Sequence, residues 1–119
     1  MLFDSTILID FLNGAGPAAT AIRSSEERSV SIITWIEVLA GARTPAAEEA
    51  AHDLLSIFDV LQLTREVAAA AVVIRRERRL KLPDAVILAT ATWHGLPLVT
   101  RNTKDFPADD ASVHVPYRL

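Results

Sequence analysis

The sequence MLFDSTILIDFL, residues 1–12, contains the unit on which the fold depends. Its opening residues are apolar and end at Asp4, as expected of a short buried strand. The residues that follow carry apolar side chains at the spacing of a helix, and Gly14 is a suitable end for that helix. The stretch therefore predicts a strand, a turn and a helix, with a carboxylate at the junction.

The alternation of strands and helices continues along the chain. Further strands are expected at residues 29–33, 58–63 and 96–100. Helices are expected at residues 17–25, 34–43, 46–56, 64–79 and 83–94. The tail, residues 102–119, is expected to be mostly loop, with room for an edge strand at residues 113–115. Strands separated by helices predict an α/β fold, in which a mainly parallel sheet carries helices on both faces.

Length and composition limit the possibilities further. The chain has 119 residues, half of them hydrophobic, which suits a single domain over residues 1–119 and is too short for two independent cores. The formal net charge is -3, so contact with a polyphosphate would need local positive charge or bound cations. There is no cysteine, which excludes disulfides and thiolate zinc sites.

The amino-terminal segment has no targeting character. It lacks a basic start and carries Asp4 and Asp10 inside its apolar stretch, so it fits neither a signal peptide nor a transit peptide. No apolar run is long enough to span a bilayer. We therefore expect a cytoplasmic protein without membrane contact.

Four acidic residues stand at the junctions between predicted strands and helices: Asp4, Glu37, Asp84 and Asp105. Each has an ordinary explanation when it is taken alone. Asp4 can cap a helix, Glu37 completes a capping box with Thr34, and Asp105 suits a turn. Asp84 lies at the positive end of a helix dipole, an interaction that contributes about 0.3–1 kcal/mol.

The four acids together favour a different explanation. In doubly wound sheets the carboxyl ends of the strands form the crevice in which ligands bind, and the predicted junctions lie at that edge. Carboxylates crowded there would repel one another unless cations neutralise them, and Mg²⁺ or Mn²⁺ prefers oxygen ligands. A metal-activated water at such a site could attack a phosphodiester.

Four segments of the chain resemble the ordered motifs of a known family. They are LFDSTILIDFL, TWIEVLAGAR, LPDAVILATA and LVTRNTKDF. In order and spacing they are similar to the motifs of PIN-domain ribonucleases, in particular VapC-type toxins of bacterial toxin-antitoxin pairs. The resemblance covers nearly the whole chain. It implies an α/β/α sandwich, an endoribonuclease that depends on Mg²⁺ or Mn²⁺, a VapB-type antitoxin that inhibits it, and a homodimer.

The resemblance also assigns roles to particular residues. Asp4, Glu37 and Asp84 match the metal ligands of the family, and Asp105 matches the fourth acid in its final motif. Asn102 stands where some members carry an acid, which leaves open whether Asp105 contacts the metal directly.

Two hydroxyl residues match small polar positions of the same motifs. Ser5 and Thr100 could hydrogen-bond a carboxylate or a metal-bound water. An ordinary role as a helix-cap hydroxyl and a strand-end hydroxyl is an equal alternative.

Basic residues near the motifs supply candidate contacts to RNA. Arg101 and Lys104 bracket the final motif, and Arg43 follows the glycine of the second. The arginines of residues 75–79 suit a solvated helix face with ordinary ion pairs. A phosphate contact would make RNA binding dependent on salt.

Two other functions deserve comparison with a nuclease. A receiver-type signalling domain needs an adjacent acidic pair after its first strand, but Asp4 is followed by Ser5, and Asp59 lies inside a predicted strand. A catalytically silent domain of the same fold that binds RNA or a partner remains open, although such a domain would be free to lose the four acids.

Overall fold

A computed structural model describes residues 1–119. The five strands are β1 (Leu2–Phe3), β2 (Ser29–Ser31), β3 (Asp59–Leu61), β4 (Leu98–Val99) and β5 (Val113–His114). The six helices are α1 (Ser5–Leu12), α2 (Gly16–Arg23), α3 (Ile32–Gly41), α4 (Pro45–Leu55), α5 (Arg65–Arg78) and α6 (Leu82–Trp93). Every predicted element is present, and the strands are shorter than the apolar runs that predicted them.

All neighbouring strands are parallel, in the order β3-β2-β1-β4-β5. The chain therefore places β2 and then β3 on one side of β1, and later places β4 and β5 on the other side. Leu2 is paired with Ser29 of β2 and with Leu98 of β4, which makes β1 the centre of the sheet. The prediction of an α/β fold with a mainly parallel sheet is confirmed.

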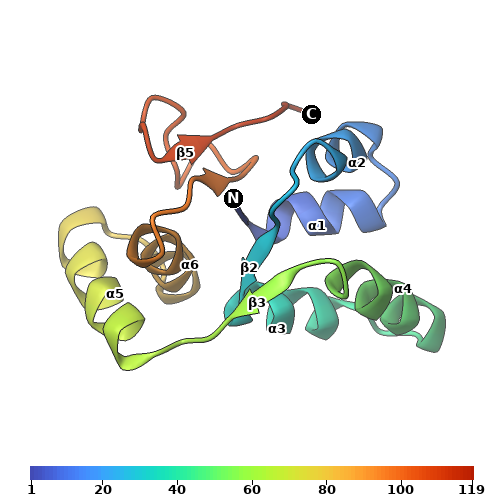
Figure 1. The fold of residues 1–119 in the computed structure, drawn as a ribbon, viewed down its shortest axis with the longest axis horizontal. Coiled ribbons are helices and arrows are strands. Elements are labelled where there is room, and N and C mark those ends of the chain that lie inside the picture. Colours follow the sequence, from blue (N-terminus) through green and yellow to red (C-terminus); the bar gives the residue numbers. More distant parts are fainter.

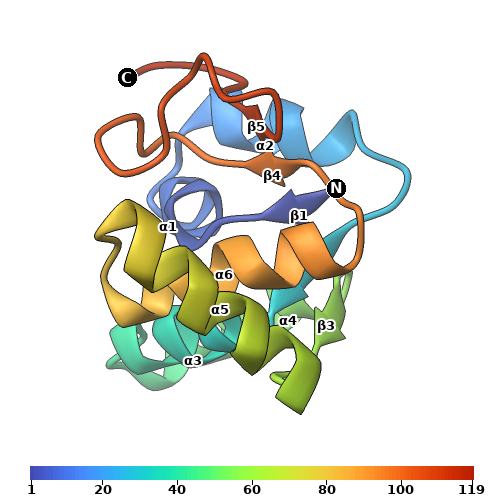
Figure 2. The ribbon, with the colours of Figure 1, turned by 90° about the vertical axis from the view of Figure 1, so that its left-hand side faces the viewer.

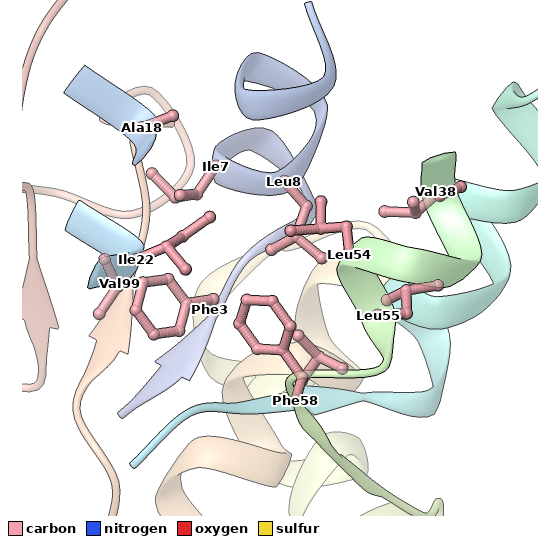
Figure 3. Close-up of a cluster of buried hydrophobic side chains, with 12 residues drawn as sticks. Phe3, Ile7, Leu8, Ala18, Ile22, Val38, Leu54, Leu55, Phe58 and Val99 are labelled. Atoms are coloured by element: carbon pink, nitrogen blue, oxygen red, sulfur yellow. The ribbon is translucent and has the colours of Figure 1, made fainter. Parts of the chain in front are cut away.

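The sheet separates two layers of helices, as Figure 1 shows, with α5 and α6 on one side and α1 to α4 on the other. The larger core lies on the side of α1 to α4. There Phe3 and Phe58 meet edge to face with ring centroids 5.5 Å apart. Leu54 and Leu55 of α4 pack beside them, and Ile22 of α2 packs on the other side of Phe3 (Figure 3).

The opposite face of the sheet is covered by α6. Because side chains alternate along a strand, Leu2 and Leu98 point to this side, while Phe3 and Val99 point to the larger core. Residues 85–91 of α6 are all buried, since α5 covers the side of α6 that faces away from the sheet (Figure 2). No helix combines the length and apolar character needed to cross a membrane.

Hydroxyl side chains mark several helix starts. The side chains of Thr44 and Thr64 accept hydrogen bonds from the amides of Ala47 and Val67, so they cap α4 and α5. The start of α3 differs from the prediction: the cap is Ser31, whose hydroxyl accepts a hydrogen bond from an amide in the first turn.

Thr34 therefore lies inside α3, and the capping box that it would form with Glu37 is wrong. Its side chain is fully buried, and no protein group hydrogen-bonds its hydroxyl. The reason is that β2 ends two residues earlier than its apolar pattern suggests, so the helix starts at Ile32.

Candidate active site

The candidate site lies where the direction of strand addition reverses, between β1 and β4. In parallel sheets this reversal leaves a crevice at the carboxyl ends of the strands. Asp4 follows β1 directly, and Thr100 follows β4 directly. The helix α3 follows β2 directly, so it also starts at this edge.

The carboxylate of Asp4 is held by two hydroxyls from different parts of the chain. Thr6 donates to its Oδ2 at 2.9 Å, and Thr100 donates to the same oxygen at 2.7 Å. Asp4 occupies the N-cap position of α1, yet its side chain makes no capping hydrogen bond. Capping therefore does not explain this residue, whose side chain is turned toward the strand end at Thr100 and is only 3% exposed.

Glu37 reaches the site from α3. It is exposed, and its Oε1 accepts a hydrogen bond of 2.6 Å from the hydroxyl of Ser5. Ser5 and Asp4 are adjacent in sequence, so this contact brings the second carboxylate beside the first. For Ser5 and Thr100, the structure shows a hydrogen bond to a carboxylate.

The carboxyl group of Asp84 is affected by the negative charges of the other three acids. Its pKa is raised to about 6, first because the carboxyl group is partly buried, and then by the negative charges of Asp4, Asp105 and Glu37, in that order. Lys81 lowers the same pKa by a smaller amount. Since electrostatic effects fade with distance, Asp4, Asp105 and Glu37 lie close enough to Asp84 for their charges to act on its carboxyl group.

Asp105 is held by Asn102 through two contacts. The side-chain amide of Asn102 donates to Oδ2 of Asp105 at 2.9 Å, and the backbone amide of Asp105 donates to Oδ1 of Asn102 at 3.2 Å. The backbone amide of Asn102 donates in turn to the hydroxyl of Thr100 at 2.9 Å. A short chain of hydrogen bonds therefore links Asp105 to the Thr100 that holds Asp4.

The fit of this site to a metal ion has two parts. The donor set consists of carboxylate and hydroxyl oxygens, which are the ligands that Mg²⁺ and Mn²⁺ prefer, and the raised pKa of Asp84 reflects burial first and then the negative charge of the other acids. However, no three acidic or histidine side chains lie close enough to share one ion. Asp4, Glu37 and Asp105 are each turned toward a polar partner of their own, so the chemistry fits and a closed ligand geometry is not formed.

The candidate RNA contacts differ in their surroundings. Lys104 and Arg43 are exposed. Arg101 is partly exposed, and its Nε and Nη2 donate to the two carboxylate oxygens of Asp10 at 2.5 and 2.9 Å, so its contact to RNA stays a prediction. The physical reason for this pairing is that Asp10 lies on the buried side of α1 and needs a counter-charge.

Three further residues lie near the site and were not predicted from the sequence: Thr6, Asp10 and Tyr117. No pattern in the sequence marks Thr6 as a residue of the site. Asp10 is marked by such a pattern, because an acid within the apolar stretch of residues 7–12 implies a buried charge that must have a partner. Which partner it takes depends on the approach of residues 101 and 117, which no local pattern shows.

Comparison with known proteins agrees with the fold and the motifs. The sequence matches the family model of the PIN domain over residues 1–108. Ribonuclease VapC10 of Mycobacterium tuberculosis is 33% identical, and the alignment covers 90% of this chain and 86% of that protein.

Solved structures give the same result in three dimensions. A chain of a toxin-antitoxin complex from Klebsiella pneumoniae is 43% identical and has a TM-score of 0.92, with 99% of this chain and 98% of that one covered. A chain of FitAcB from Neisseria gonorrhoeae is 26% identical, with a TM-score of 0.78 and 99% of both chains covered. The chain therefore belongs to the PIN-domain family, in its VapC-type branch.

Proposed function

We propose that this chain is an endoribonuclease toxin that hydrolyses RNA phosphodiester bonds with the help of a divalent metal ion, Mg²⁺ or Mn²⁺. We further propose that residues 1–119 act as a single PIN domain in the cytoplasm. The observation that supports the proposal is that Asp4, next to the reversal point of the sheet, acts together with Asp105 and Glu37 on Asp84, whose pKa burial and these charges raise. The similarity to a protein named a ribonuclease supports the same reaction.

Each acid has a distinct part in this proposal. Asp4, Glu37, Asp84 and Asp105 would hold the metal, which when bound supplies positive charge to the phosphodiester and activates the attacking water. Both hydroxyls that contact Asp4 donate to Oδ2, which holds this carboxylate in one orientation. The hydroxyl of Ser5 orients Glu37, and Asn102 orients Asp105.

Removal of the metal is the direct test of this function. The purified chain, free of any inhibitor protein, should cut a mixed cellular RNA pool into discrete fragments with Mg²⁺ or Mn²⁺. Excess EDTA should abolish cutting, and added Mn²⁺ should restore it. Cutting that persists at full rate in EDTA would contradict the role of the metal, and would direct attention to a contaminating nuclease or another site.

Lys104 is proposed as a contact to the RNA phosphate backbone, and Arg43 as a second one. Both are exposed, and Lys104 is adjacent in sequence to Asp105. Lys104→Ala should weaken RNA binding for all sequences and reduce by roughly one the slope of log affinity against log salt concentration. Fluorescence anisotropy with a labelled RNA at several salt concentrations measures both quantities. An unchanged slope would remove Lys104 from the interface.

Two protein partners belong to the proposal. Several similar structures are toxin-antitoxin complexes, which supports inhibition by a VapB-type antitoxin. A homodimer is supported by apolar side chains that α5 and α6 leave exposed, namely Val72, Val73 and Leu82. A catalytically silent RNA- or partner-binding domain is the remaining alternative, and the cleavage assay separates it from the nuclease.

A further inference from the structure

We propose that Asp10, Arg101 and Tyr117 form a positioning cluster, which holds residues 100–105 against α1 and so keeps Asp4 and Asp105 in place. Its effect on RNA cleavage rests on the proposed nuclease function, while its effect on the structure does not. None of the three residues is assigned to hold the metal or to touch the RNA.

The cluster is built around a buried charge. Asp10 is only 6% exposed, and its two oxygens accept three hydrogen bonds: two from the guanidinium of Arg101 and one of 2.7 Å from the hydroxyl of Tyr117. The hydrogen bond from Arg101 is the first cause of a lowered pKa at Asp10, although burial opposes it. Such a paired and hydrogen-bonded charge has a well-defined geometry, because each oxygen is satisfied in only one arrangement.

Residue 101 is attached to α1 at two points. Its side chain binds Asp10, and its backbone amide donates to the hydroxyl of Thr6 at 3.3 Å. Thr6 and Asp10 are four residues apart, so they lie one above the other on the same face of α1. Two attachments one helical turn apart restrain both the position and the direction of the chain as it leaves β4.

The same residues are in contact with the candidate site. The Thr6 hydroxyl that accepts from residue 101 donates to Asp4, and the neighbouring Thr100 donates to the same Asp4 oxygen. Asn102 follows Arg101 in sequence. The backbone amide of Asn102 donates to the hydroxyl of Thr100, and the side-chain amide of Asn102 donates to Asp105. A shift of residue 101 would therefore move the partners of two of the four acids at once.

A positioning role and a phosphate contact make opposite predictions for Asp10→Asn, a substitution that keeps the shape of the side chain and removes its charge. If Arg101 contacted phosphate, the freed guanidinium should bind RNA at least as tightly and with a steeper salt dependence. If the cluster positions residues 100–105, the variant should hold those residues less firmly, bind metal more weakly and turn over more slowly.

The test uses Asp10→Asn and Tyr117→Phe, with Asp110→Asn as the matched control. Asp110 accepts a 2.5 Å hydrogen bond from Arg78 of α5, which is an ion pair of the same chemistry that ties the tail to another helix. The first readout is amide hydrogen exchange in the metal-free protein. We expect exchange at Asn102 and Asp105 to become about tenfold faster in Asp10→Asn, less so in Tyr117→Phe, and to stay unchanged in the control.

The second readout is Mn²⁺ binding by calorimetry, which needs no cleavage. Loss of an outer partner of metal-binding residues typically costs about 10- to 100-fold in metal affinity, and we expect a loss in that range for Asp10→Asn. Tyr117→Phe keeps the ion pair and removes one hydroxyl, so it should fold even if Asp10→Asn does not, and it should lose affinity by a smaller factor.

Unchanged exchange and unchanged Mn²⁺ affinity in both variants would overturn the positioning role. Tighter RNA binding by Asp10→Asn with unchanged metal affinity would also overturn it, in favour of a phosphate contact. If the wild-type chain binds Mn²⁺ but cuts no RNA, the proposed nuclease function fails, and the exchange and binding data still decide the role of the cluster.

Discussion

Asp84→Asn is expected to reduce RNA cleavage to below about 1% of the wild-type rate, since even the loss of an outer partner of metal ligands costs about 10- to 100-fold. The substitution keeps the size of the side chain and removes the negative charge. Asp84 stands in the first turn of α6 and is the acid on which the other three act most clearly. The neutral amide is a weaker ligand for a hard cation than a carboxylate.

The control for this experiment is Asp59→Asn, the same chemical change at the opposite edge of the sheet. Asp59 begins β3, whereas the candidate site lies where the parallel strands end, and its side chain is exposed. Single-turnover cleavage of one labelled RNA, with Mg²⁺ and with Mn²⁺, gives the rate for each protein. A wild-type rate for folded Asp84→Asn would show that the site is elsewhere, and a large loss in Asp59→Asn would show that the assay is not specific.

Asp84→Asn is also expected to make the metal-free protein more stable at neutral and alkaline pH. The folded-state pKa of Asp84 is about 6, raised by burial and by the other acids, while the unperturbed value is 3.8. A carboxyl group with a raised pKa favours the folded state only while it is protonated. The contribution of the Asp84 carboxyl group to the free energy of unfolding of the wild type is therefore lost as pH rises from about 4 to about 7.

Asp84→Asn has no charge to bury, so the two proteins should be equally stable near pH 4 and should diverge above it. A shift from 3.8 to about 6 corresponds to at most about 3 kcal/mol. Partial exposure of the carboxyl group should reduce the difference to about 1–2 kcal/mol.

Urea unfolding at several pH values in EDTA gives the free energy of unfolding of both proteins. A constant difference from pH 4 to pH 8 would contradict the raised pKa. Added Mn²⁺ should stabilise the wild type more than the variant, because a ligand that binds only the folded state raises its stability by mass action.

The predicted and the observed fold agree because most element boundaries depend on residues within a few positions of each boundary. The start of α5 after Thr64 and of α6 near Pro83 depends on residues that cap or begin a helix within a few positions. The end of β2 was misplaced because Ser31, Ile32 and Ile33 suit either a strand or a helix start. There the capping hydrogen bond of Ser31 decides the boundary.

Asp4 and Asp84 could be named from the sequence because they lie at element junctions, which in a parallel α/β fold meet at one edge, whereas Glu37 lies beyond the first turn of α3 and Asp105 lies in the loop after β4. Their partners could not be named. Thr100 is 96 residues from Asp4, and Tyr117 is 107 residues from Asp10, so their hydrogen bonds depend on how β4 and the tail approach α1.

The sequence by itself therefore determined the order of the elements and the parallel sheet, and it named the candidate acids, because caps, turns and apolar spacing act over a few residues. Only the tertiary structure decided that Arg101 faces Asp10 rather than solvent. The physical reason is that a carboxylate buried on α1 requires a counter-charge, and the arginine brought within reach by the end of β4 supplies it.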